Sequence, residues 1–96
     1  MDPAKPDINI SDVVVSTAGR DTGSWFYVIS TDPVYLFLAN GKDRTLDRPK
    51  RKKRKHVQKV LRSETRVAEK LRLGDKVLNG ELRRDLAFLA RETASE

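Results

Sequence analysis

The pattern of apolar and polar positions divides the chain into a β-rich first part and a helical second part. Residues 13–15, 25–29 and 34–39 are short apolar runs, rich in β-branched and aromatic side chains. Such runs, separated by glycine, proline and asparagine at roughly ten-residue spacing, favour the strands of a small barrel or sandwich. We therefore predict a mainly β domain at residues 8–60, preceded by a flexible amino-terminal segment at residues 1–7.

Alternation along the predicted strands indicates a candidate core. Successive side chains of a strand point to opposite faces, so Phe26 and Val28 share one face, whereas Trp25, Tyr27 and Ile29 share the other. The opposite parity remains an alternative. The side chains that we place in the core are Val13, Val15, Phe26, Val28, Leu36 and Leu38.

Asn40 and Gly41 directly follow the third apolar run and predict a tight hairpin. A type I′ turn needs positive φ at both central residues, which this pair tolerates better than other residues. The return strand is then expected at residues 42–46. It would be polar and would lie at an edge of the sheet, where its charges would discourage pairing with other chains.

Helical periodicity dominates the last third of the chain. Ser63 is the expected N-cap of a first helix, and Gly74 its C-terminal stop. Asn79 is the expected N-cap of a second helix over residues 80–93, so we predict a two-helix hairpin at residues 63–93. The apolar stripes that would pack are Val67, Ala68 and Leu71 on the first helix, and Leu82, Leu86 and Leu89 on the second, with Phe88 beside them.

The net charge of +6 is concentrated in one segment. Residues 42–62 carry eleven basic and two acidic side chains, whereas residues 1–41 carry two basic and five acidic ones. Residues 63–96 carry seven of each sign. The centre of the positive segment is a basic run of six consecutive cations at residues 50–55. Such focused positive charge is typical of proteins that bind polyanions.

Residues 57–60, between the basic run and the helices, have two interpretations. They fit a short closing strand of the β domain. Val57, Val60 and Leu61 also fit a helix that begins near Val57, and periodicity leaves both interpretations open.

Residues 12–29 combine a valine strand, a loop with Gly19 and Gly23, and a second apolar strand. With the Asn-Gly pair, the basic run and the single histidine in the same order, this stretch resembles the KOW motif. It looks specifically like the small KOW-domain RNA-binding proteins, which are similar to archaeal and eukaryotic-type large-subunit ribosomal proteins. The resemblance covers roughly residues 8–58. Ser11 departs from the pattern, because many KOW motifs carry glycine there.

The resemblance implies an SH3-like five-stranded KOW barrel and a ribonucleoprotein role in translation, with ribosomal RNA or the large ribosomal subunit as partner. Lysine and arginine bind phosphates by direct attraction and by counterion release, and arginine adds bidentate contacts. In KOW domains the loop between the first two strands also approaches RNA. The residues expected to bind RNA are Gly19, Arg20, Gly23, Trp25, Arg44, Arg48, Lys50, Arg51, Lys52, Lys53, Arg54, Lys55, His56 and Lys59.

Each of these features also has a simpler interpretation. The basic run fits a solvated surface or a nuclear-localisation signal. The two loop glycines fit a plain turn in which Asp21 pairs with Arg20. Trp25, Tyr27 and Tyr35 fit the core as well as a stacking platform for unpaired bases, and Trp25 is the preferred platform because it lies next to the loop.

Catalytic and metal-binding motifs are missing from the sequence. It contains no cysteine and one histidine, and it has no nucleophile–base, phosphate-loop or paired-carboxylate motif. We therefore expect no enzyme activity, metal, cofactor or small-molecule substrate. No apolar run approaches the ~20 residues that span a bilayer, and the amino terminus lacks a secretory pattern. We expect a cytoplasmic protein without membrane contact, monomeric when free.

A protein-interaction adaptor is the second hypothesis. SH3-like barrels also hold peptides in aromatic clefts, which Trp25, Tyr27 and Tyr35 would line here. The apolar face of the helical tail would offer a further docking surface. Duplex DNA binding is a third, weaker hypothesis.

Overall fold

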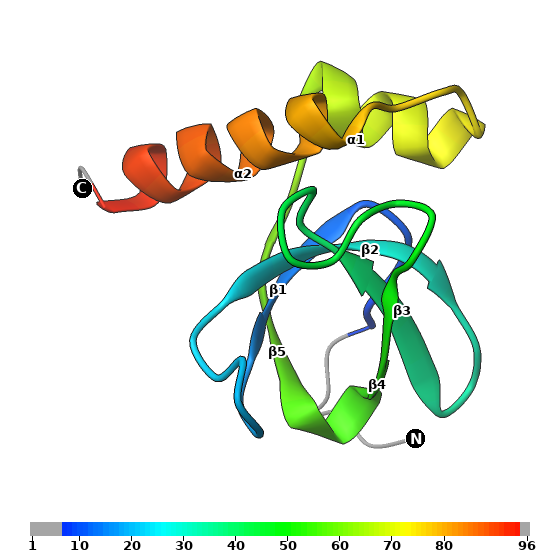
Figure 1. The fold of residues 1–96 in the computed structure, drawn as a ribbon, viewed down its shortest axis with the longest axis vertical. Helices are drawn as coiled ribbons and strands as arrows, with labels where there is room; N and C mark the ends of the chain where they lie inside the picture. Colours follow the sequence, from blue (N-terminus) through cyan, green and yellow to red (C-terminus); the bar gives the residue numbers. More distant parts are fainter. Residues whose placement is uncertain (1–6, 95–96) are drawn as a thin grey trace.

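The computed structural model describes residues 7–94 and contains one five-stranded antiparallel sheet followed by two helices (Figure 1). The sheet order is β4-β3-β2-β1-β5. The prediction of a mainly β fold with a helical tail is confirmed at this level, and residues 1–6 of the expected flexible segment lie outside the described residues. The elements are β1 (Asp12–Ser16), β2 (Trp25–Thr31), β3 (Tyr35–Ala39), β4 (Lys50–Lys53), the short 3-10 helix η1 (Arg54–His56), β5 (Val57–Arg62), α1 (Arg66–Leu73) and α2 (Asn79–Ala94).

The sheet is curved but not closed. Strands β4 and β5 are its two edges, and no ladder joins them within residues 7–94. Irregular pairing between Val13 and Val14 on β1, and between Val28 and Ser30 on β2, increases the local twist and bends the sheet. No helix of the described residues is long and apolar enough to cross a membrane.

The sheet contributes to a buried cluster on each of its two faces. The inner cluster fills the concave face and consists of Ile8, Val14, Phe26, Val28, Leu36 and Leu38. The outer cluster joins the sheet to the helices and consists of Val13, Tyr27 and Ala39 from the strands with Val67, Ala68, Leu82 and Leu86 from the helices. Figure 1 shows both helices on one side of the sheet, with η1 at its far end. Sheet and helices therefore share the outer cluster, whereas no helix residue belongs to the inner cluster.

Five of the six predicted core residues are buried, and only Val15 is not, but the residues of β1 point to the opposite faces from those expected. Val14 pairs directly with Phe26, and directly opposed residues project to the same face, so Val14 belongs to the inner cluster. Val13 is fully buried on the other face, and Val15 is half-buried. Three consecutive valines carry no alternation, so only the pairing register decides which of them points inward.

The predicted return strand at residues 42–46 is wrong, because these residues form an irregular loop. Gly41 has φ of 78°, and a Cβ on it would lie 2.1 Å from the Asn79 carbonyl oxygen. The Asn79 side chain in turn accepts a hydrogen bond of 2.8 Å from the backbone of Leu46. Gly41 therefore allows a close contact with the start of α2. The strand that follows β3 begins only at Lys50.

The residues after the basic run form a strand, and the alternative of a helix beginning near Val57 is excluded. β5 pairs with β1 along its length, including Asp12 with Arg62 and Ser16 with Val57. Edge pairing with β1 outweighs the helical periodicity, which was only a partial fit.

The two helices end and begin close to the predicted positions, but with different caps. Thr65, not Ser63, is the N-cap of α1, and its hydroxyl accepts the backbone N–H of Ala68 at 3.2 Å. Gly74 ends α1 in the left-handed conformation, as expected. Asn79 is the first residue of α2, and its side chain binds the loop before β4 instead of capping.

Candidate nucleic-acid interface

The basic run is itself an edge strand, so its side chains alternate between two faces. Lys52 lies opposite the buried Leu36, and Lys53 lies opposite Tyr35. Directly opposed side chains share a face, so Lys50 and Lys52 point to the inner side, whereas Arg51 and Lys53 point outward. Lys52 is only 8% exposed. The six cations therefore do not form one continuous exposed surface, because some of them point to the inner side of the sheet.

Asp21 of the β1–β2 loop binds the two inward lysines. Its carboxylate oxygens lie 2.8 Å from Lys50 Nζ and 2.7 Å from Lys52 Nζ. Lys52 also donates to the Ala18 carbonyl at 2.6 Å, and the Ser16 hydroxyl donates to Asp21 at 2.7 Å. We call this arrangement of Ser16, Ala18, Asp21, Lys50 and Lys52 the loop clamp. It places the glycine loop beside β4.

The charge of Asp21 is strongly favoured in the loop clamp. Partial burial by itself would raise the pKa of this carboxyl. Hydrogen bonds from Lys50 and Lys52, and then from Ser16, outweigh burial and hold the pKa far below its ordinary value of 3.8. One carboxylate therefore stays ionised against two lysines and cancels about half of their charge.

Four cations around the loop clamp remain available to a ligand. Arg20, Arg51, Lys53 and Lys55 are all exposed, and none forms an ion pair with a carboxylate of residues 7–94. The Arg51 guanidinium instead lies over the Tyr35 ring, 4.5 Å from its centroid. These four exposed cations come from β4, from η1 and from the glycine loop, and they provide uncompensated charge suited to phosphates.

Other predicted residues of the basic segment have structural partners. Arg54 donates to the Asp32 carbonyl at 3.0 Å and to the Ile8 carbonyl at 3.3 Å. Lys59 lies 3.1 Å from the Asp12 carboxylate. The Arg54 contacts hold the amino-terminal residues and the β2–β3 turn against η1, and the Lys59 contact joins β5 to β1.

The glycine loop lies beside the basic strand, where its Asp21 binds Lys50 and Lys52. Gly19 and Gly23 have φ of 87° and 90°, which favours glycine at both places. A hollow of about 330 Å³ is lined by three cations, Arg20, Arg44 and Lys50, and by two carboxylates, Asp21 and Asp43. The turn between β1 and β2 contributes to this lining, and the net charge of the hollow is only slightly positive.

The remaining predicted residues are distributed more widely. Arg48 is exposed in the loop before β4, and half-buried His56 accepts the Thr17 N–H through its backbone carbonyl at 2.9 Å. Trp25 is half-buried and packs against the outer cluster, away from the inner lysines. Tyr27 is fully buried. Of the three aromatic candidates, Tyr35 is the one that lies at the basic strand.

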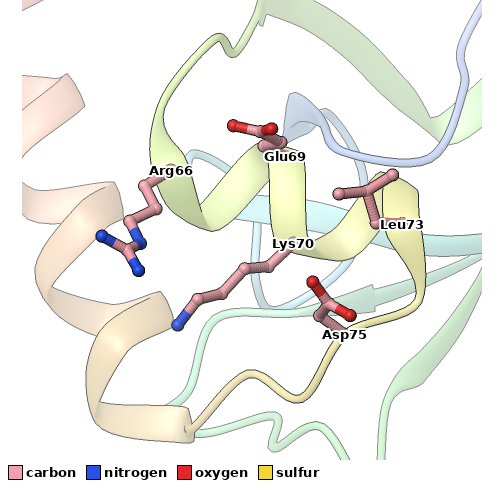
Figure 2. Close-up of a pocket in the computed structure, with 5 residues that line it drawn as sticks. All are labelled: Arg66, Glu69, Lys70, Leu73 and Asp75. Atoms are coloured by element: carbon pink, nitrogen blue, oxygen red, sulfur yellow. The ribbon is translucent and has the colours of Figure 1, made fainter.

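A further hollow of about 440 Å³ lies along α1 (Figure 2). It is lined by two cations, Arg66 and Lys70, and by two carboxylates, Glu69 and Asp75. Lys70 extends toward the start of α2, where it pairs with Glu81 at 3.0 Å. Its balanced charge offers no attraction for a polyanion, so this hollow is not part of the interface.

Residues 7–94 contain no cluster of three or more side chains that could hold a metal ion. No protein-family model matches the chain, and no curated protein matches it significantly. The assignment of an interface therefore depends on the geometry and on the resemblance of residues 12–29 to a KOW motif.

Asp21 is the important residue that the sequence prediction missed. The sequence allows Asp21 to pair with its neighbour Arg20, whereas in the structure its carboxylate binds Lys50 and Lys52. A signal was present, because lysines two residues apart share a face of a strand. This spacing predicts a shared face only if the basic run is a strand, and the sequence alone does not show that.

Proposed function

We propose that this chain is an RNA-binding module of the KOW type, associated with ribosomal RNA. The observation that carries the proposal is the exposed cationic surface of Arg20, Arg51, Lys53 and Lys55 on β4, η1 and the adjoining glycine loop. The finer description of the fold as an SH3-like barrel belongs to the proposal. It is supported by the strand order and by the strong curvature of the sheet around the inner cluster.

Phosphate contact would supply most of the affinity. Lysine and arginine that carry no internal counter-ion gain most when a phosphate neutralises them, and RNA releases condensed cations in exchange. Contacts to the backbone do not read bases, so sequence preference should be weak and RNA shape should matter more. The ribosomal assignment comes from the resemblance alone.

The test is binding of the whole chain to fluorescent ribosomal RNA fragments at increasing salt. With four phosphate contacts, the logarithm of the affinity should fall by roughly 3 for each tenfold rise in salt on single-stranded regions. A flat salt curve would remove the electrostatic basis of the proposal. Equal-length duplex DNA as competitor distinguishes RNA preference from general polyanion binding.

A charge-matched pair of variants locates the surface. Lys53→Ser with Lys55→Ser removes two charges from the proposed interface, and Lys76→Ser with Arg91→Ser removes two exposed charges elsewhere. The first variant should lower both affinity and salt slope, while the second should change them little. Equal losses in both would show that only net charge matters and would contradict the assignment to β4.

The adaptor hypothesis has less support from the geometry. Its aromatic cleft does not form from the three expected side chains, because Tyr27 is fully buried and Trp25 packs against the outer cluster. Capture of partners from a lysate before and after nuclease treatment separates the two functions. Partners that survive nuclease would favour the adaptor.

A further inference from the structure

The pleat of β3 and β4 creates an aromatic and cationic face on the outer side of the sheet edge. Tyr35 and Phe37 flank the inward-pointing Leu36, and their cross-strand partners are Lys53 and Arg51. Directly opposed residues project to the same face, so these two aromatic and two cationic side chains lie together. All four are half-buried or exposed.

This face is covered at only one of its ends. Ala39, two residues beyond Phe37 on β3, is fully buried in the outer cluster beneath the helices. Tyr35 and Phe37 belong to neither of the two core clusters found within residues 7–94. The helices therefore do not pack on these two rings. This is notable because an aromatic ring buries a large apolar area and the chain contains few aromatic residues.

A hollow adjoins the open end of this face. It has a volume of about 350 Å³, within the usual range of ligand pockets. The glycine loop contributes Ala18 and Gly19 to its lining, and the sheet edge contributes Tyr35 and Arg51. The residues that line it are Ala18, Gly19, Tyr35, Arg51, Lys52, Lys53 and His56.

We infer that the Tyr35–Arg51 pair is a stacking position for one unpaired base of the bound RNA, with the adjoining phosphate against Lys53. The inference rests on the proposed RNA-binding function and adds the substrate class, namely RNA with an accessible unpaired nucleotide. Every base has a π-face, and both an aromatic ring and a planar guanidinium stack on it. The ring and the guanidinium are already oriented, 4.5 Å from centroid to central carbon.

The geometry favours this place over Trp25, the platform expected from sequence. Trp25 lies next to the glycine loop in the chain, but its ring packs against the outer cluster. Tyr35 is ten residues further along, yet strand pairing places it opposite Lys53. A base on Tyr35 would have two cations of β4 beside it, Lys53 directly opposite and Arg51 over the ring.

The experiment compares three anionic probes on the whole chain at one salt concentration. The probes are a short uridine oligomer, an RNA duplex with the same number of phosphates, and inorganic polyphosphate of matched charge. Tyr35→Leu keeps apolar bulk but removes the ring, and Tyr35→Phe is the matched control that keeps it. We expect Tyr35→Leu to weaken oligomer binding by roughly five- to 150-fold, with Tyr35→Phe close to wild type. Duplex and polyphosphate binding should not change.

The outcomes separate this inference from the proposed function. If the wild-type chain binds neither RNA, the proposed function itself fails. If it binds both, and Tyr35→Leu leaves oligomer affinity unchanged or weakens duplex and polyphosphate equally, only the stacking position is overturned.

A second measurement needs no variant and so avoids any effect of folding. The Tyr35 ring protons should shift upfield in the NMR spectrum when the uridine oligomer is added, because a stacked base shields them. Polyphosphate should not produce this shift. Equal shifts with both probes would show that Arg51 merely leaves the ring for a phosphate, and would overturn the inference.

Discussion

Tyr27 joins the sheet to the helices through its hydroxyl group. The ring is fully buried in the outer cluster, and the hydroxyl donates to the Asp85 carboxylate on α2. The same oxygen lies 2.8 Å from Ser63 Oγ, and Thr65 donates to Asp85 at 2.8 Å. Burial of the hydroxyl, and then its hydrogen bond to Asp85, raise the pKa of Tyr27 to about 12.

Tyr27→Phe should lower the free energy of unfolding by about 1–3 kcal/mol, because it removes the donor that serves a half-buried carboxylate. Urea unfolding at neutral pH measures the change. Tyr35→Phe removes the same atom from a half-buried ring outside the core clusters and should have little effect. Equal losses in the two variants would contradict the structural role of the Tyr27 hydroxyl.

The same pair of variants should differ at high pH. The pKa of Tyr27 is raised in the folded chain, so its contribution is fully present below the ordinary pKa of 10.0 and is lost as the pH rises toward about 12. Wild type and Tyr35→Phe should share this loss. In Tyr27→Phe the loss should be smaller, because that group is no longer there to ionise.

The extended conformation of β4 gives its cations two different roles, because alternate side chains point to opposite faces of the sheet. A uniform row of lysine and arginine carries no alternation in its sequence, so the chain alone predicts one cationic ribbon. As an edge strand paired with β3, it turns Lys50 and Lys52 toward the glycine loop and Arg51 and Lys53 toward solvent. The inward pair organises the loop, and the outward pair is free to contact a ligand.

Asp21→Asn should destabilise the fold by about 1–3 kcal/mol at pH 7, because two lysines, one of them buried, lose their shared counter-ion. The pKa of Asp21 is lowered by folding, so its contribution is present above the ordinary pKa of 3.8 and is lost as the pH falls below it. Wild-type stability should therefore fall more steeply below pH 4 than that of Asp21→Asn. Urea unfolding at pH 7 and at pH 3 measures both effects.

Asp75→Asn is the matched control for the loop clamp. Asp75 is exposed after the end of α1 and takes part in no ion pair within residues 7–94. The Asp75→Asn variant should have the wild-type free energy of unfolding at pH 7 and should lose as much of it at pH 3 as the wild type does. An Asp21→Asn chain that behaves like this control would show that the loop clamp contributes nothing to the fold.

The whole molecule is held together by a core that the two halves share. Val13, Tyr27 and Ala39 are fully buried sheet residues that pack with Leu82 of α2. Without the helices, this face of the sheet would expose its largest buried ring to water. Sheet and helices should therefore unfold in a single transition.

Leu82→Ala should lower the free energy of unfolding of the whole chain by about 2–5 kcal/mol, as is typical when a fully buried leucine is truncated. Leu78→Ala makes the same chemical change at a site that is 55% exposed and should cost little. Amide hydrogen exchange of the strands and helical circular dichroism follow sheet and helices separately. If Leu82→Ala shifts only the helical signal, the tail is an independent unit.

Most of the fold could be predicted from local patterns. β-Branched and aromatic runs located β1, β2 and β3, and periodicity with Gly74 located α1 and α2, because these preferences act over a few residues. The prediction of a return strand after Asn40 and Gly41 is wrong, because the contact of Gly41 with α2 outweighs the preference of this pair for a tight hairpin turn. That partner lies almost forty residues away, and no local pattern records it.

Local sequence features are enough to predict strands followed by helices and a positive charge gathered in one segment, since composition and order are local properties. Which cations are free depends on how the strands meet in the fold. Pairing register directs Lys52 inward to Asp21 and Arg51 outward onto Tyr35, and register is a property of two strands that meet in space.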